Sequence, residues 1–119
     1  MYWLLGPLQI NHATSSNFNH TQLTEFDDSG QVLFSFGKRG QGSLSYSTSL
    51  YQQNFESSIT IIGEKGTVKL GGQYMNTVDY CEIENYTLPT LPDAQPANDY
   101  GNYKGSAANH HFVIQDVIN

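Results

Sequence analysis

Apolar and polar residues alternate along much of this chain, which is the pattern of half-buried β-strands. In one segment, Val32, Phe34 and Phe36 fall on one face. Leu33 and Ser35 fall on the other, so one side of this strand belongs to the core. Similar patterns predict strands at residues 8–19, 30–36, 42–52, 57–62, 67–70 and 78–84. Because short turns separate these segments, we expect an open, mainly antiparallel β-sheet of about six strands.

Segment 42–52 has the cleanest alternation in the chain. Its larger residues are Leu44, Tyr46, Thr48 and Leu50, and between them stand Ser43, Ser45, Ser47 and Ser49. A face made only of serines has two interpretations. It is either a solvated sheet face, or a surface of small side chains that another subunit approaches closely.

The last third of the chain has a different pattern. Residues 87–103 contain three prolines and little periodicity, which predicts a long surface loop. Ser106 then fits an N-cap position, and apolar residues recur at helical spacing to the end of the chain. We therefore predict a C-terminal amphipathic helix, and the fold class is α+β. At the other end, residues 1–5 are predicted to be a helix turn closed by Gly6 and Pro7.

Composition excludes several classes of function. The 119 residues carry 5 Lys+Arg against 11 Asp+Glu, a formal net charge of −6, which argues against nucleic-acid binding. No apolar run approaches the ~18 residues of a membrane span, so no membrane partner is expected. The single cysteine, Cys81, has no internal disulfide partner, and a reducing cytoplasm is the simplest setting.

The most suggestive chemical cluster is Asn109, His110 and His111. Neighbouring helical residues point about 100° apart, so the two imidazoles do not readily share a metal ion, and no metal site is predicted. Either His110 covers the core and His111 is half exposed, or the cluster contacts a sugar hydroxyl or phosphate. Tyr100 and Tyr103, just before it, either stack on a sugar ring or anchor the loop.

A glycine-rich segment, residues 37–42 (GKRGQG), resembles a nucleotide-binding loop only superficially. Its glycines are in the wrong order for a dinucleotide-binding turn, and it lies between two predicted strands. We therefore predict a hairpin loop there, and no catalytic or cofactor-binding residue is assigned to this chain.

Residues 55–72 (FESSITIIGEKGTVKLGG) are the most informative segment of the chain. They are predicted to form a strand, a glycine-rich turn and a second strand. Together with residues 3–6 (WLLG) and 109–114 (NHHFVI), this order of motifs resembles the C-terminal domain of the Gfo/Idh/MocA oxidoreductases. Members of that family are NAD(P)-dependent sugar and cyclitol dehydrogenases. The resemblance is closest to members that act on nucleotide-linked sugars, the nucleotide-sugar 3-dehydrogenases.

This resemblance implies that residues 1–119 are a single C-terminal domain for substrate binding and oligomerisation, without the N-terminal dinucleotide-binding domain. NAD or NADP would then bind outside the chain in a full-length enzyme, and this fragment alone is expected to be inactive. A sugar or nucleotide-sugar substrate would meet the cluster at residues 109–111 and the two loop tyrosines. Family members typically form homo-oligomers through the open face of this sheet, which favours the serine face as a subunit contact.

A second hypothesis is a stand-alone β-sheet module that binds a carbohydrate or a protein partner. It accounts equally well for the tyrosines and the serine face. The two hypotheses differ in what lies upstream, since only the first requires a βαβ unit with a glycine-rich turn.

Overall fold

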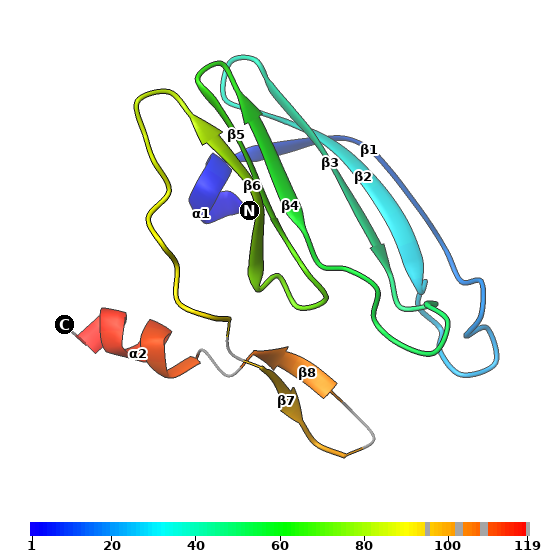
Figure 1. Cartoon of the computed structure of the whole chain (residues 1–119). Helices are drawn as coiled ribbons and strands as arrows, with labels where there is room; N and C mark the ends of the chain where they lie inside the picture. Colours follow the sequence, from blue (N-terminus) through cyan, green and yellow to red (C-terminus); the bar gives the residue numbers. More distant parts are fainter. Residues whose placement is uncertain (95, 102–103, 108–109, 119) are drawn as a thin grey trace. The chain divides into compact units, whose positions relative to one another are not determined.

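The computed structural model describes residues 1–94, 96–101, 104–107 and 110–118 (Figure 1). The chain divides into two compact units, Met1–Gln53 and Asn54–Asn119. Each unit is built around a small antiparallel sheet of three strands. The predicted fold class is confirmed, because the chain consists mostly of antiparallel strands in open sheets with a small C-terminal helix.

The first unit contains α1 (Tyr2–Leu5), β1 (Leu8–Ser16), β2 (Ser29–Phe36) and β3 (Gly40–Ser47). As predicted, the short helix ends at Gly6, whose φ of 75° lies in the left-handed region that favours glycine. The strands pair in the order β1-β2-β3, with an irregularity in β1 between Ile10 and His12. The glycine-rich segment forms the turn between β2 and β3, so the predicted hairpin loop is confirmed.

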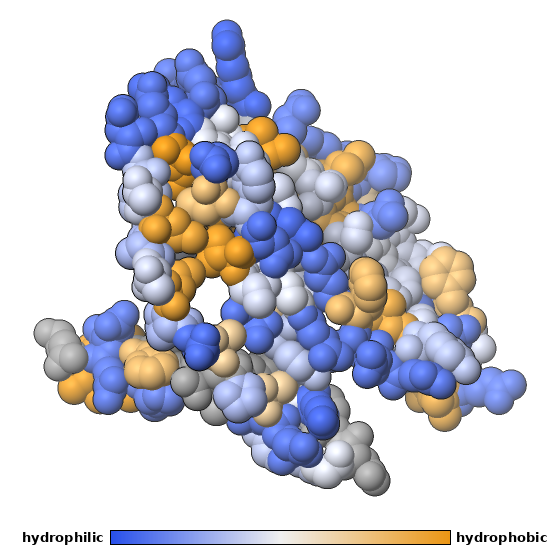
Figure 2. All heavy atoms as spheres, viewed as in Figure 1, coloured by the Kyte–Doolittle hydropathy of each residue, from blue (hydrophilic) through white to orange (hydrophobic). Residues whose placement is uncertain are grey.

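Strand register gives this first sheet one apolar and one polar face. On the apolar face, Ile10, Phe34 and Gly42 lie opposite one another, as do Ala13, Val32 and Leu44. Phe34, at 4% exposure, is the one fully buried apolar side chain among the described residues. The core is therefore thin, and many other large apolar side chains reach the surface, as the orange groups in Figure 2 show.

The second unit contains β4 (Ile59–Gly63), β5 (Gly66–Gly71), β6 (Thr77–Ile83), β7 (Ala97–Asp99), β8 (Lys104–Ala107) and α2 (His110–Ile118). The predicted hairpin is the β4–β5 pair, and β6 completes the sheet on the other side of β5. On the apolar face of this sheet, Ile61, Val68 and Cys81 lie opposite one another. Cys81 is half-buried. The side chains described for α2 are exposed.

The described residues form eight strands where about six were predicted, because β7 and β8 form an additional hairpin. Within the segment predicted to be a loop, Gly101 adopts a φ of 82° and its N–H donates to Asp99 Oδ1 at 3.0 Å. Lys104 Nζ lies 3.8 Å from Asp99 Oδ2 across the pair. Ser106 consequently lies in β8, and the prediction that it is the N-cap of the last helix was wrong.

Two strands are shorter than predicted. β1 ends at Ser16 because the next residue, Asn17, folds back: its Nδ2 donates to the Phe26 carbonyl at 3.1 Å. β3 ends at Ser47, where the Ser47 hydroxyl accepts the N–H of Ser49 at 3.1 Å and ends the regular ladder. Ser49 therefore lies just beyond the strand to which it was assigned.

Candidate functional site

The serines of β3 belong to a wider polar face that covers the whole first sheet. Ser43, Ser45 and Ser47 are exposed. Through the strand register they lie in rows with residues of β2 and β1: Ser43 with Leu33 and His12, Ser45 with Gln31 and Thr14, and Ser47 with Ser29 and Ser16. This serine-lined face is therefore made of small or polar side chains, with Leu33 as its large apolar member at 51% exposure.

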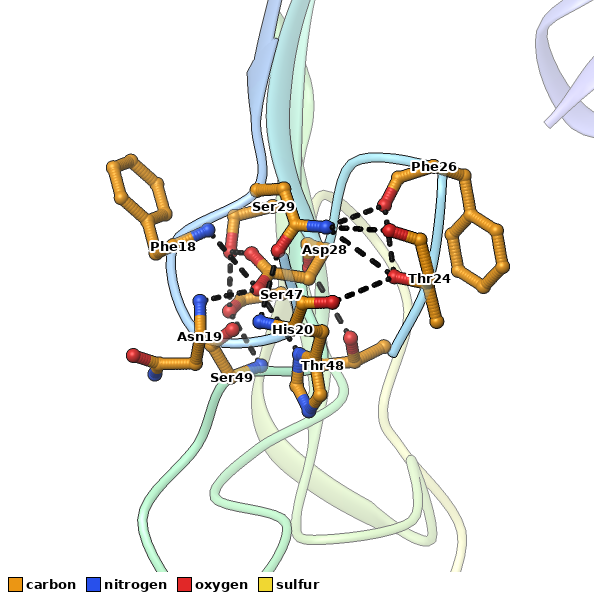
Figure 3. A network of polar contacts seen from close by, with 11 residues as sticks. Phe18, Asn19, His20, Thr24, Phe26, Asp28, Ser29, Ser47, Thr48 and Ser49 are labelled. Carbon is orange, nitrogen blue, oxygen red and sulfur yellow. Dashed lines mark hydrogen bonds and ion pairs between the residues drawn. The ribbon is translucent and has the colours of Figure 1, made fainter. Parts of the chain in front are cut away.

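One end of this face adjoins the buried carboxylate of Asp28, which is only 1% exposed (Figure 3). The backbone N–H groups of Phe18 and Asn19 donate to Asp28 Oδ2 at 3.1 and 2.8 Å. His20 Nδ1 lies 3.0 Å from the same oxygen. Because an ionised carboxylate only accepts hydrogen bonds, Nδ1 is the donor in this pair.

Hydrogen bonding keeps Asp28 ionised. Burial by itself would raise the pKa of this carboxyl, since it disfavours the charged form. The side chain of Ser49, the Asn19 N–H, His20 and the Phe18 N–H outweigh burial and hold the pKa of Asp28 well below its usual range. The Ser49 hydroxyl is itself buried and close enough to contribute, although it makes no hydrogen bond of regular geometry.

A chain of hydroxyl groups connects this carboxylate to the serine-lined face. Ser29 Oγ donates to Asp28 Oδ1 at 2.9 Å, and Ser29 Oγ lies 2.8 Å from Ser47 Oγ. A hydroxyl has one proton, and that of Ser29 is directed to the carboxylate, so Ser47 must donate to Ser29. Ser47 Oγ in turn accepts the Ser49 N–H. The directions of the two hydroxyl bonds in this chain therefore follow from the charge on Asp28.

The backbone of Asp28 is fixed as well. Its carbonyl accepts the Thr48 N–H at 2.8 Å and the Thr48 hydroxyl at 3.3 Å. Asn17, at the other end of the loop between β1 and β2, donates to Thr24 and Phe26 and accepts the N–H of His20 at 2.9 Å. Hydrogen bonds to Asn17 at one end and to Asp28 at the other therefore hold this loop in place.

Only part of the predicted substrate-binding set can be placed. Asn109 and Tyr103 lie outside the described residues. His110 begins α2, but its side chain also lies outside the described part of the chain. His111 is exposed and its ring contacts that of the adjacent Phe112, with centroids 3.9 Å apart. Tyr100, at 68% exposure, stands beside the β7–β8 turn. Their contact with a substrate therefore stays a prediction.

A second polar cluster orders the entry into β4. Lys69 Nζ, on β5, lies 2.9 Å from Glu56 Oε1 and 3.3 Å from Asp79 Oδ2. The hydrogen bond with Glu56, followed by that with Asp79, raises the pKa of Lys69. The hydroxyl of Thr77 donates to Asp79 at 2.7 Å and, together with Lys69, lowers the pKa of Asp79 despite partial desolvation. The cluster joins the segment before β4 to β5 and β6.

The sequence did not indicate either cluster. His20 lies one residue beyond the strand predicted at 8–19, and Asp28 lies between that strand and the one predicted at 30–36, so no periodic pattern singled out either residue. The available signal was the run Asp27-Asp28-Ser29-Gly30, in which carboxylates directly precede a strand. That signal is weak, because acidic residues are common in loops.

Two further properties bear on function. Within the described ranges, no group of three or more His, Cys, Asp and Glu side chains is arranged to hold a metal ion. None of the helices in the described part of the chain has the length and apolar character needed to span a bilayer.

Comparison with known proteins gives a specific relationship. No protein-family model matches the chain, and no curated protein matches it. Among solved structures, the chain is similar to the WlbA dehydrogenase from Bordetella pertussis in complex with NADH and UDP-GlcNAcA, with 34% identity and a TM-score of 0.63 over 69% of this chain. It is also similar to the WlbA dehydrogenase from Chromobacterium violaceum, crystallised with the same two ligands, with 30% identity and a TM-score of 0.63 over 73% of this chain.

The chain spans only 25% of the length of each of these dehydrogenases. Within that part, similarity in both sequence and structure defines a dehydrogenase-related domain. The resemblance to the Gfo/Idh/MocA oxidoreductases, predicted from the order of short motifs, is thereby confirmed.

Proposed function

We propose that this chain is the C-terminal substrate-binding and oligomerisation portion of an NAD(P)-dependent dehydrogenase that acts on a sugar or nucleotide-linked sugar. The observation that carries this proposal is the similarity to two WlbA dehydrogenases, both of which bind NADH and UDP-GlcNAcA. The chain matches a quarter of their length, so the activity belongs to a longer protein.

The cofactor is proposed to bind outside these residues. A dinucleotide site needs a strand, a glycine-rich turn and a helix whose N-terminus faces the pyrophosphate. In the described part of this chain, the glycine-rich turn Gly37–Gly40 leads from β2 into β3, and no helix follows it. We therefore propose that NAD or NADP binds elsewhere in a longer protein and that this fragment is catalytically incomplete.

The proposed contribution to substrate binding comes from the second unit. Tyr100 and Tyr103 carry ring faces and hydroxyls suited to a sugar, while Asn109, His110 and His111 supply polar groups around the start of α2. The exposure of the His111 and Tyr100 side chains supports this proposal.

The proposed contribution to oligomerisation comes from the serine-lined face. Its rows of Ser, Thr and Gln side chains are short or flexible, so a second sheet could approach closely. The interface residues are Ser43, Ser45 and Ser47, with Ser49 beyond the end of β3. The expected assembly is a homo-oligomer in which the same face meets itself.

Titration with NADH by calorimetry tests where the cofactor binds. We expect no binding to residues 1–119 alone, whereas a protein that also carries an upstream βαβ unit should bind NADH and reduce NAD in the presence of a UDP-sugar acid. Micromolar binding of NADH by this chain alone contradicts the proposal that the cofactor binds outside residues 1–119. Failure of the longer protein to oxidise any UDP-sugar favours a binding module without enzymatic activity.

A further inference from the structure

The hydroxyl chain from Asp28 gives the serine-lined face a fixed hydrogen-bond polarity at one end. Bonds run from the Ser49 N–H to Ser47, from Ser47 to Ser29, and from Ser29 to the carboxylate. Such chains strengthen one another because each donor is polarised by the next acceptor. With its proton committed to Ser29, the Ser47 hydroxyl has only a lone pair left for any outside group.

We propose that Asp28 is a positioning residue for the subunit contact, acting through Ser29 to fix Ser47 as a hydrogen-bond acceptor that a second copy of this chain meets with a donor. This inference rests on the proposed use of the serine-lined face for oligomerisation. It adds a specificity element to that face, because a group offering only acceptors would leave Ser47 unsatisfied.

The face supplies suitable donors itself. Gln9, Gln31 and Gln41 project onto the same side as Ser47, and each carries an amide NH₂ group. In a two-fold contact, the patch that offers the acceptor also offers the donors, so the face is self-complementary. A second copy is therefore the occupant that matches this chemistry.

Hydrogen bonding to the carboxylate explains why Asp28 stays ionised at neutral pH. The carboxylate is enclosed and held ionised by two backbone N–H groups and His20, so the polarity of the chain does not change with ordinary variation in pH. The adjacent Asp27 differs, because it is exposed and bonds only to the Ser15 hydroxyl among the contacts of the described residues.

Sedimentation velocity on the whole chain tests the inference, with Ser29→Ala as the main variant. It removes the link to Ser47 while leaving Asp28 and its backbone contacts in place. We expect the dissociation constant of the oligomer to rise roughly 2- to 10-fold, the effect of one hydrogen bond. Ser29→Thr, which keeps the hydroxyl, should retain the wild-type constant.

A double-mutant cycle separates a positioning role from a structural one. If Ser29 acts through Ser47, then Ser29→Ala combined with Ser47→Ala weakens association no more than Ser47→Ala alone. A merely structural role would lower the unfolding midpoint of Ser29→Ala while leaving the association of the folded chain unchanged, and that result overturns the inference.

Ser45→Arg distinguishes this inference from the proposed function, since Ser45 lies outside the hydroxyl chain. If Ser45→Arg dissociates the oligomer but Ser29→Ala has no effect, the interface stands and the role of Asp28 is rejected. If the wild-type chain is monomeric, or Ser45→Arg has no effect, the proposed interface fails and the inference falls with it.

Discussion

Phe34 lies over Gly42 on the neighbouring strand, so close that a Cβ built on Gly42 would come within 2.4 Å of the Phe34 ring. The same relationship recurs where Phe36 covers Gly40 and Tyr46 covers Gly30. Aromatic rings on one strand thus shield glycines on the strand beside it, which replaces the side-chain packing that glycine lacks. In a unit with so thin a core, these pairs carry much of the packing.

Gly42→Ala should therefore destabilise the first unit. The added methyl group forces the Phe34 ring out of its position, and overpacking of this kind costs about 1–3 kcal/mol. Urea unfolding followed by tyrosine and tryptophan fluorescence measures the change. Gln41→Ala, at the adjacent exposed position of β3, is the control and should cost less than about 0.5 kcal/mol. Equal stability of the two variants would contradict the packing role of Phe34.

Stability should fall in acid because of Asp28. Its folded-state pKa lies below the unfolded value of about 3.9, so its stabilising contribution is fully present above that value. The contribution is lost as the pH falls from about 5 toward the lowered pKa. Unfolding free energies measured from neutral to acidic pH should show wild type more stable than Asp28→Asn at pH 7. The two curves should converge in acid, and a constant gap would show that ionisation of Asp28 is not the cause.

Lys69 should order the segment that leads into β4. The Ser57 N–H donates to the Gly72 carbonyl at 3.0 Å, next to the Lys69–Glu56 pair. In Lys69→Gln we expect the Ser57 amide to exchange a few-fold faster in native-state hydrogen exchange, the size of effect typical of a half-exposed ion pair. Lys65→Gln is the control, because the Lys65–Glu84 pair is largely exposed and lies at the other end of β5. Unchanged exchange in Lys69→Gln would assign the segment's order to backbone contacts alone.

His111→Ala should weaken binding of a UDP-sugar in the intact protein about 2- to 10-fold, as expected for the loss of one hydrogen bond to substrate. Gln115→Ala, one turn further along α2 and also exposed, should bind normally. Calorimetric titration with a UDP-sugar acid measures both. Unchanged affinity in His111→Ala would remove this residue from the proposed substrate site.

Local patterns were enough to predict most of the two main sheets. The alternation of Val32, Phe34 and Phe36 with polar residues identifies β2, and the β4–β5 hairpin follows from two β-branched runs around a glycine-rich turn. These signals lie within a few residues of one another, which is why sequence alone reveals them.

The Asp28 network and the β7–β8 hairpin depend on relationships that the local pattern does not contain. The network joins Asp28 to Thr48, 20 positions away, and includes the loop that folds back from Asn17. β7 is only three residues long and depends on the Asp99–Gly101 turn and the contact with Lys104 for its pairing. Prolines nearby suggested a loop, but the pairing of β7 with β8 forms a short hairpin there.

The position of Cys81 has a practical consequence. As the one thiol in the chain, half-buried opposite Val68 on the apolar face of the second sheet, it is a built-in chemical reporter. The rate at which a maleimide labels it would record how often that sheet opens, without any introduced mutation. Any partner or domain that covers the apolar face would appear as slower labelling of a single, already assigned site.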